Sequence, residues 1–343
     1  MELKKINKIL NILKKFSKKK KKRKCFLISN TSKKISQPFF VTPLRESKKS
    51  IYSGVVVFEN KAAEEIAKKI DGKVDYVYVD LEKKISNKKD KLVNIERAVK
   101  ENIKISHIKN YKSNDITVNS IETFINDYFF EDARGVGGKN ILIIGSGNIG
   151  SKVALRLVES GAKVDIFRRN QKKLKIISKA INHIKPRYTK SQCRSIDYKK
   201  INFYNYDVII GCSNNKFKIK KIKSESIKKK QLILDVGKGV FEDKILDNLL
   251  KKGKLIFRID VESMLSSFID STIETESFFK SNFIKPYQKF NLVKKGVLGK
   301  RGDIIVDNVD KPKQIIGICG RGGELINTNY KKINFLKSKI IKK

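Results

Sequence analysis

The residues best suited to chemistry form a glycine-rich loop between an apolar run and a helical pattern. The loop reads Gly145-Ser146-Gly147-Asn148-Ile149-Gly150 and directly follows Ile141-Leu142-Ile143-Ile144. In a strand–loop–helix unit of this kind, the first glycine permits a tight turn, the second lets the backbone approach a pyrophosphate, and the third lets helix and strand pack closely. The free amides at the helix start then face the phosphates. The spacing therefore predicts a dinucleotide-binding site to which all six loop residues contribute.

The residues after the second strand of this unit indicate which dinucleotide binds. An NAD site usually has an Asp or Glu there, which holds the ribose 2′-hydroxyl. Here the strand 164–167 is followed by Arg168 and Arg169. Asp165 lies inside the strand, so its carboxylate cannot easily reach the ribose 2′-hydroxyl. Two guanidinium groups suit a 2′-phosphate, although they are also two more cations in a very basic chain. The pair favours NADP over NAD as the cofactor.

Polar residues that follow the next predicted strands add to this site. Residues 206–211, 232–237 and 255–260 read as neighbouring strands of a doubly wound sheet. Ligands in such sheets bind beyond the carboxyl ends of the strands. We therefore expect the following residues near the nicotinamide: Cys212, Ser213, Asn214, Gly237, Lys238 and Asp260. The first three of these are predicted cofactor contacts.

A hydride-transfer site also needs an acid/base group within hydrogen-bond reach of the reacting atom. Candidates are His107 and Lys238, and Lys109 and Asp260 are further groups that could take this role. The unperturbed pKa of histidine, about 6.5, suits proton transfer, and Lys238 has glycines on both sides. A histidine on a strand is more often structural, so the sequence leaves the catalytic group unknown.

The chain of 343 residues is long enough for two domains with separate cores. Strand patterns at 25–29, 54–58, 74–79 and 105–108 alternate with helical patterns at 61–70 and 92–101. This alternation predicts an N-terminal α/β substrate domain, residues 25–114, with a mainly parallel sheet. A polar hinge at 110–115 should lead into a helix capped by Asn114 or Asp115. The Rossmann domain is then predicted to span residues 115–270.

Residues 271–343 have a different character. Glycines precede the two apolar runs 303–307 and 315–318, which predicts a C-terminal extension with a glycine-rich antiparallel β-hairpin and a basic tail. Asp303, Asp307 and Asp310 suggest a cation site, but acidic residues beside strands more often form turns. No metal site is predicted here.

Residues 1–24 form a basic, amphipathic leader. Its apolar residues at helical spacing are Leu3, Ile6, Leu10, Leu13 and Phe16. Lysines lie opposite them, and a second basic run covers 18–24. Such a segment fits a weak contact with a membrane surface, or a leader helix that docks or frays; we favour the second interpretation.

Composition limits the other partners and the compartment. The formal charge is +43, but only 12 of the 78 basic residues are arginine, so the lysine excess reads as compositional rather than as a specific nucleic-acid interface. Hydrophobic residues make up 40% of the chain, and no apolar run approaches the roughly 18 residues of a membrane span. The four cysteines are widely separated and only two histidines accompany them, which favours reduced thiols in a cytoplasmic protein. A homo-oligomer stays open.

Residues 138–170 resemble the NAD(P)-binding domain shared by shikimate/quinate dehydrogenases and glutamyl-tRNA reductases. Arg168-Arg169-Asn170 stands where that group often has Asn-Arg-Thr, so the resemblance assigns the 2′-phosphate contact to Arg169. It extends over roughly residues 115–260. The order of domains, with the substrate domain first, is also similar.

The catalytic signatures of both families are missing. The nearest match to the shikimate dehydrogenase lysine segment, 41–48, has the wrong spacing, and no Asn-Thr-Asp occurs. Cys25 follows a lysine run instead of the segment that a glutamyl-tRNA reductase needs. The sequence thus predicts a two-domain α/β oxidoreductase that uses NAD(P) on a small polar substrate in the interdomain cleft. The alternative is an NAD(P)-binding sensor or assembly module without its own turnover.

Overall fold

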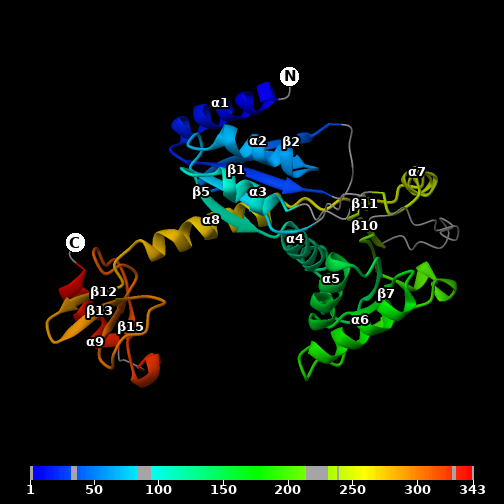
Figure 1. The fold of residues 1–343 in the computed structure, drawn as a ribbon. Helices are drawn as coiled ribbons and strands as arrows, with labels where there is room; N and C mark the ends of the chain where they lie inside the picture. The colour runs from blue at the N-terminus through cyan, green and yellow to red at the C-terminus, as the bar shows by residue number, and fades with distance from the viewer. Residues whose placement is uncertain are drawn as a thin grey trace. The chain divides into compact units, whose positions relative to one another are not determined.

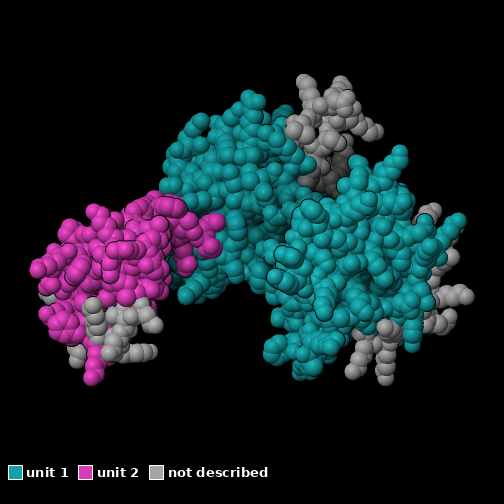
Figure 2. Space-filling model, turned by 90° about the horizontal axis from the view of Figure 1, so that it is seen from below, with its two compact units in different colours: residues 1–270 teal, residues 271–343 magenta. Residues whose placement is uncertain are grey.

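The computed structural model describes residues 3–31, 37–83, 94–213, 231–237, 239–326 and 330–341. The chain divides into two compact units, residues 1–270 and 271–343 (Figure 2). The first unit contains two sheets flanked by helices, and the second contains a smaller sheet (Figure 1). The predicted α/β class, with an N-terminal α/β domain before a Rossmann domain, is confirmed.

The N-terminal sheet has the strand order β2-β3-β1-β4-β5. Its strands are β1 (Arg23–Asn30), β2 (Phe39–Glu46), β3 (Ser50–Val57), β4 (Tyr76–Asp80) and β5 (His107–Tyr111). Helices α2 (Asn60–Ile70) and α3 (Ile95–Asn102) connect the parallel strands, as the alternation predicted. Strand β2 was not predicted; it contains Pro43 and pairs antiparallel with β3 at the sheet edge, where a proline is tolerated.

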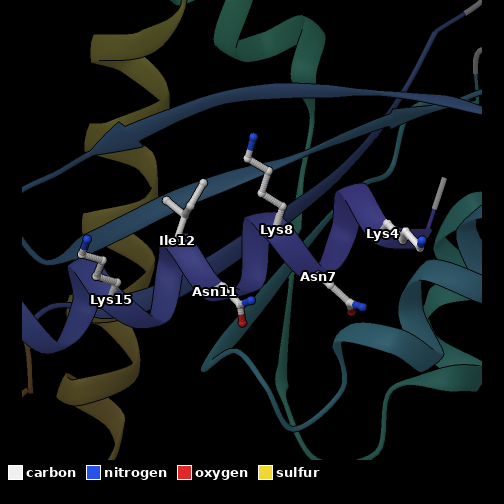
Figure 3. Close-up of a pocket in the computed structure, with 6 residues that line it drawn as sticks. All are labelled: Lys4, Asn7, Lys8, Asn11, Ile12 and Lys15. Carbon is white, nitrogen blue, oxygen red and sulfur yellow. The ribbon is translucent and has the colours of Figure 1, made fainter. Parts of the chain in front are cut away.

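Helix α1 (Leu3–Lys20) packs on this sheet. Its side chains Ile6, Ile9, Leu10 and Leu13 are buried in the same hydrophobic core as Val55 of β3. Residues 3–20 therefore form a helix that docks on the N-terminal fold, in agreement with the interpretation favoured for this segment. The outward side of the helix is polar, with a shallow hollow (Figure 3) lined by Lys4, Asn7, Lys8, Asn11, Ile12 and Lys15.

The predicted polar hinge at 110–115 is a strand end and a helix start. Residues 110–111 complete β5, and α4 (Ser113–Tyr128) begins two residues later, after Lys112 as N-cap. Neither Asn114 nor Asp115 caps the helix, because their side chains have other partners. The Asn114 amide donates to Glu82 over 2.6 Å, and Asp115 pairs with Lys152 of α5.

The nucleotide domain is a six-stranded parallel sheet of order β11-β10-β9-β6-β7-β8. Its strands are β6 (Asn140–Ile144), β7 (Lys163–Phe167), β8 (Cys193–Ser195), β9 (Val208–Gly211), β10 (Leu232–Asp235) and β11 (Ile256–Phe257). Its further helices are α5 (Asn148–Glu159), α6 (Gln171–Ile184) and α7 (Asp243–Lys251). The chain winds outward from β6 in both directions, so the switch point of this doubly wound sheet lies between β6 and β9. Helices α5 and α6 lie beside β7 (Figure 1).

Helix α8 (Glu262–Phe279) returns the chain from the nucleotide domain to the N-terminal sheet. The hydroxyls of Tyr52 and Ser266 lie 2.8 Å apart, and the Asp270 carboxylate accepts from the Ser47 hydroxyl at 2.6 Å and the Lys49 amide at 3.1 Å. These contacts fix the first part of the helix on the N-terminal sheet.

The second unit contains a four-stranded sheet of order β12-β13-β14-β15. Its elements are β12 (Ile284–Tyr287), β13 (Phe290–Lys294), β14 (Ile304–Val306), β15 (Ile315–Ile318) and α9 (Tyr330–Ile340). The antiparallel β14–β15 pair matches the predicted hairpin, whereas β12 and β13 were not predicted. The Asp307 carboxylate accepts from the amides of Lys313 and Gln314, each at 2.9 Å, and so shapes the turn.

Within the described residues, no helix is long and apolar enough to cross a membrane.

Candidate functional site

The glycine-rich loop lies at the carboxyl end of β6, at the switch point of the Rossmann sheet. Gly145 has a φ of +102°, a conformation that L side chains rarely adopt. A Cβ at this position would lie 2.7 Å from the backbone nitrogen of Ser213. The Gly145 amide donates to the Phe167 carbonyl at 2.9 Å. The tight turn therefore holds the loop against the ends of β7 and β9.

Gly150 and Gly147 have different surroundings. A Cβ on Gly150 would lie 2.1 Å from the Gly145 carbonyl oxygen, so this glycine is required where α5 approaches the loop. A Cβ on Gly147 would meet nothing within 4 Å. The space beside Gly147, at the start of α5, is open to a ligand, and the first-turn amides of the helix have no intrahelical acceptors. This is the geometry that a pyrophosphate requires.

The loop also carries a buried polar atom without a partner. The Ser146 hydroxyl oxygen is fully buried and has no hydrogen-bond partner among the residues that the structure describes. Arg168 Nη1 donates to the Ser146 carbonyl at 3.2 Å, which brings a guanidinium to the edge of the loop. An unpaired hydroxyl and a cation beside an open helix start fit a phosphate-bearing cofactor.

The arginine pair and the strand before it occupy the expected ribose position. Arg168 is half-buried, and Arg169 is exposed at the end of β7 without an ion-pair or hydrogen-bond partner among the described residues. Asn170 caps α6 by accepting from the Lys173 amide at 2.9 Å. Asp165 is buried and accepts from Arg194 and from Tyr206, so its carboxylate is not available to a ribose.

The segment after β9 lies beside the loop. The Cys212 amide donates to the Ile144 carbonyl at 2.8 Å, and a Cβ on Gly237 would lie 2.1 Å from the Ser213 carbonyl oxygen. The structure thus brings Cys212, Ser213 and Gly237 to the loop. Burial raises the pKa of Cys212 to about 12, so the residue is a neutral thiol near pH 7. Two predicted residues, Asn214 and Lys238, lie outside the described residues.

The other acid/base candidates are not brought to the loop. His107 is the first residue of β5, at the amino end of its strand, where its ring lies 5.6 Å from that of Tyr76. In parallel sheets the ligand edge is the carboxyl end. The geometry therefore gives no support to a catalytic His107. Lys109 lies over the Tyr76 ring, and Asp260 pairs with Arg45 of β2 at 3.5 Å.

A group of polar side chains at the carboxyl ends of β1, β4 and β5 was missed in the sequence. We call it the polar edge, and it consists of Asn30, Asp80, Glu82, Tyr111 and Ser113. The Asp80 carboxylate is 1% exposed and accepts from the Ser113 hydroxyl at 2.8 Å and the Glu82 amide at 3.1 Å.

Two of these side chains retain hydrogen-bonding capacity. The amide oxygen of Asn30 is buried and has no hydrogen-bond partner within the described part of the chain. Burial raises the pKa of Tyr111, whose hydroxyl bonds to Ser29, so the phenol remains protonated. Polar residues at the strand ends were the available signal for this group, because parallel strands place their carboxyl ends at one edge.

Among the described side chains, no group of three His, Cys, Asp or Glu residues is placed to hold a metal ion.

A family comparison matches the nucleotide domain. Residues 131–239 match the model of the shikimate/quinate 5-dehydrogenase family, which is less than half of the chain. The predicted resemblance of this domain to the shikimate dehydrogenase group is thereby confirmed. A comparison with curated protein sequences found no match.

Solved structures give only a distant likeness. A shikimate dehydrogenase in complex with NADP+ is 16% identical, with 73% of this chain and 96% of that one covered and a TM-score of 0.39. Dipicolinate synthase A chain from Bacillus subtilis is 14% identical, with coverages of 75% and 98% and a TM-score of 0.36. A hetero-hexameric glutamate dehydrogenase from Thermus thermophilus is 11% identical, with coverages of 76% and 70% and a TM-score of 0.40. At these values the whole-chain likeness supports no substrate.

Proposed function

We propose that this protein is an NAD(P)-dependent oxidoreductase with a preference for NADP. The observation that carries the proposal is the open space beside Gly147 at the start of α5, which stands next to the unpaired Ser146 hydroxyl. Residues 145–150 would hold the pyrophosphate, and the segment that contains Cys212 and Ser213 would border the nicotinamide side. Bound NADP(H) would accept or supply a hydride.

The preference for NADP rests on the end of β7. That position has two arginines and no carboxylate, and the only acid of the strand, Asp165, is engaged by Arg194 and Tyr206. Arg169 is the guanidinium that remains exposed, so we assign it the 2′-phosphate. The family match to the domain that contains this strand supports the assignment.

The substrate is a small polar molecule held at the polar edge of the N-terminal sheet. Fold geometry supports this choice, since the carboxyl ends of parallel strands form the ligand edge. The buried, unpaired amide oxygen of Asn30 offers an acceptor, and Asp80 orients the Ser113 hydroxyl.

Cofactor titration tests the proposal. NADPH should bind the wild-type chain, as followed by fluorescence. Gly147→Val should weaken it by more than about tenfold, because the added side chain fills the pyrophosphate space. The variant should keep its fold, since that space is open and the φ of −89° suits a β-branched residue. Absence of both NADPH and NADH binding at millimolar concentration would overturn the proposal.

A second candidate function is a sensor or assembly module that binds NAD(P) without turnover. The position of His107 at the amino end of β5, away from the ligand edge, favours this alternative. Oxidation of NADPH in the presence of a panel of carbonyl and imine compounds discriminates between the two. Steady turnover with any member supports the enzyme, and tight cofactor binding without turnover supports the module.

We further propose a weak, electrostatic contact between α1 and anionic membranes. The apolar side of α1 is buried, so contact must use its exposed lysines, such as Lys4, Lys8 and Lys15. Retention on phosphatidylserine vesicles at low salt should be lost in the triple variant Lys4→Gln/Lys8→Gln/Lys15→Gln. It should persist in a control that removes the same charge outside α1, Lys172→Gln/Lys199→Gln/Lys252→Gln. Equal retention of the two triple variants would contradict it.

We also propose that the protein is cytoplasmic. All four cysteines are unpaired, and reduced thiols are typical of that compartment. A homo-oligomer stays a prediction.

A further inference from the structure

A polar hollow opens at the edge of the Rossmann sheet opposite to the glycine-rich loop. Its volume is about 570 Å³, which is within the range of small-molecule sites. Asn140 and Lys163, the first residues of β6 and β7, line it at the amino ends of these strands. Gly145 lies five residues beyond Asn140, or roughly 16 Å along a strand. The hollow is thus separate from the proposed cofactor site.

A buried carboxylate holds one wall of the hollow in place. Arg194 of β8 donates from Nε to Asp165 Oδ1 at 2.8 Å and from Nη2 to Oδ2 at 3.1 Å. The Tyr206 hydroxyl donates to Oδ2 at 2.8 Å. Burial and the neighbouring Asp165 raise the pKa of Tyr206, so its hydroxyl remains a donor. This bidentate geometry orients the arginine on a rigid element.

The ion pair with Asp165 engages only part of the Arg194 guanidinium. The Asp165 side chain is 6% exposed, whereas that of Arg194 is 66% exposed. Nη1 of Arg194 lies outside the bidentate pair and offers two further N–H donors. The planar group therefore has donors left for a second anion.

The rest of the lining is cationic or amide-bearing. Lys163 and Lys200 add two ammonium groups, and Asp165 is the only acid among the described residues of the lining. The three cations Lys163, Lys200 and Arg194 thus exceed the one carboxylate by two charges. Asn202 accepts from the Tyr204 amide at 3.1 Å with its oxygen, which leaves its NH2 group as a donor.

We propose that this hollow is a second anion site, which binds a small phosphorylated molecule independently of the cofactor loop. Guanidinium and ammonium groups form the strongest, charge-assisted hydrogen bonds to phosphate oxygens, and the side-chain amides add neutral donors. The hollow goes beyond the proposed oxidoreductase function, because none of its lining residues belongs to the loop 145–150 or to the polar edge.

Calorimetric titration with inorganic pyrophosphate at physiological ionic strength tests this site. Wild type should bind, and Lys163→Gln/Lys200→Gln should weaken binding by about tenfold or more, because two charge-assisted contacts are lost. Lys172→Gln/Lys199→Gln is the matched control. It removes the same charge from exposed positions outside the lining and should change the affinity by less than about twofold. Circular dichroism should show that both variants remain folded.

The cofactor loop is the competing pyrophosphate site, and Gly147→Val separates the two. The second site predicts that binding persists in Gly147→Val and weakens in Lys163→Gln/Lys200→Gln. Loss in Gly147→Val alone would place the ligand at the loop and overturn the inference. Equal losses in the two lysine pairs would reduce the effect to general surface charge, and no binding to wild type would also overturn it.

Discussion

Arg168 and Arg169 are neighbours in the chain, but their surroundings give them different tasks. Arg168 donates to the Ser146 carbonyl and so supports the shape of the glycine-rich loop. Arg169 is exposed and makes no such contact within the described part of the chain. A cation that supports the loop affects both cofactors, whereas one that meets the 2′-phosphate affects NADPH alone.

Substitutions of the two arginines should therefore have different effects on the affinities for NADPH and NADH. Arg169→Ala should weaken NADPH by about 1.5–3 kcal/mol and leave NADH nearly unchanged, because one charge-assisted contact is lost. Arg168→Ala should weaken both cofactors by similar factors. The measurement is the ratio of the dissociation constants of NADPH and NADH in each variant. An unchanged ratio in Arg169→Ala would remove the cofactor assignment.

Gly150 tests the packing of the loop without reference to any cofactor. Its added Cβ would lie 2.1 Å from the Gly145 carbonyl oxygen, a backbone atom that cannot move without shifting the turn. Gly150→Ala should therefore destabilise the chain by about 1–3 kcal/mol, despite the higher helix propensity of alanine. Gly147→Ala, with open space around its Cβ, is the control and should be close to neutral in urea denaturation. Equal stability of the two variants would contradict this packing.

At the scale of elements, apolar runs and glycines predicted the sheets well where the strands are central. Strands β1, β3, β4, β6, β7, β9 and β10 all coincide with apolar runs of the sequence. Most of the missed strands lie at edges or are short; β13 (Phe290–Lys294), which lies between β12 and β14, is the exception. Strand β2 carries Pro43, β12 carries Pro286, and β8 has only three residues, 193–195. Edge strands need no continuous apolar run, so their patterns are weak.

In the candidate site, local features could be predicted from the sequence, whereas contacts between distant segments could not. The loop 145–150 was predictable because Gly145 and Gly150 answer local backbone requirements, and Gly147 leaves space for a ligand. The polar edge was not, because Asn30, Asp80 and Ser113 are more than 30 residues apart in sequence and meet only through the order β1-β4-β5. The position of His107 could not be predicted for a related reason. Strand β5 begins two residues later than the pattern indicated, so the histidine lies at the start of the strand instead of near its end.

Asp71 connects α2 to the segment before β5, and its carboxylate makes the stability of this connection depend on pH. Its carboxylate accepts from the amides of Lys104, Ile105 and Ser106, each at 2.9 Å. Burial raises the pKa of Asp71, but these backbone hydrogen bonds outweigh it and hold the pKa below its usual value. A carboxyl group with a lowered folded-state pKa stabilises the fold above its unfolded pKa of about 3.9, and this contribution is lost as the pH falls through the folded value.

Asp71→Asn should therefore cost about 1–2 kcal/mol in urea denaturation at neutral pH, and the difference from wild type should shrink below about pH 4. Glu65→Gln, at an exposed carboxylate of α2, is the matched control and should show no such pH-dependent difference. A penalty for Asp71→Asn that is equally large at neutral and at acid pH would show that the charge of the carboxylate is not what stabilises this connection.

At the scale of the whole molecule, the two compact units have separate cores. The cofactor loop lies in residues 1–270, whereas Val306, Leu292 and Ile340 are buried in a core of the 271–343 unit. Each of the hydrophobic clusters formed by the described residues contains residues of one unit only, so damage to one should not spread into the other. The chain is thus expected to unfold in more than one step.

Val306→Ala and Val158→Ala test this independence, because both valines are fully buried but in different units. Val306→Ala should cost about 2 kcal/mol and lower the melting transition of the 271–343 unit by roughly 10 °C, with NADPH affinity unchanged. Val158→Ala, in α5 behind the glycine-rich loop, should lower the other transition and weaken NADPH. Differential scanning calorimetry with cofactor titration measures both effects. If Val306→Ala shifted every transition together and weakened the cofactor as well, the two units would form one cooperative core, and the C-terminal sheet would have to be counted as part of the cofactor-binding structure.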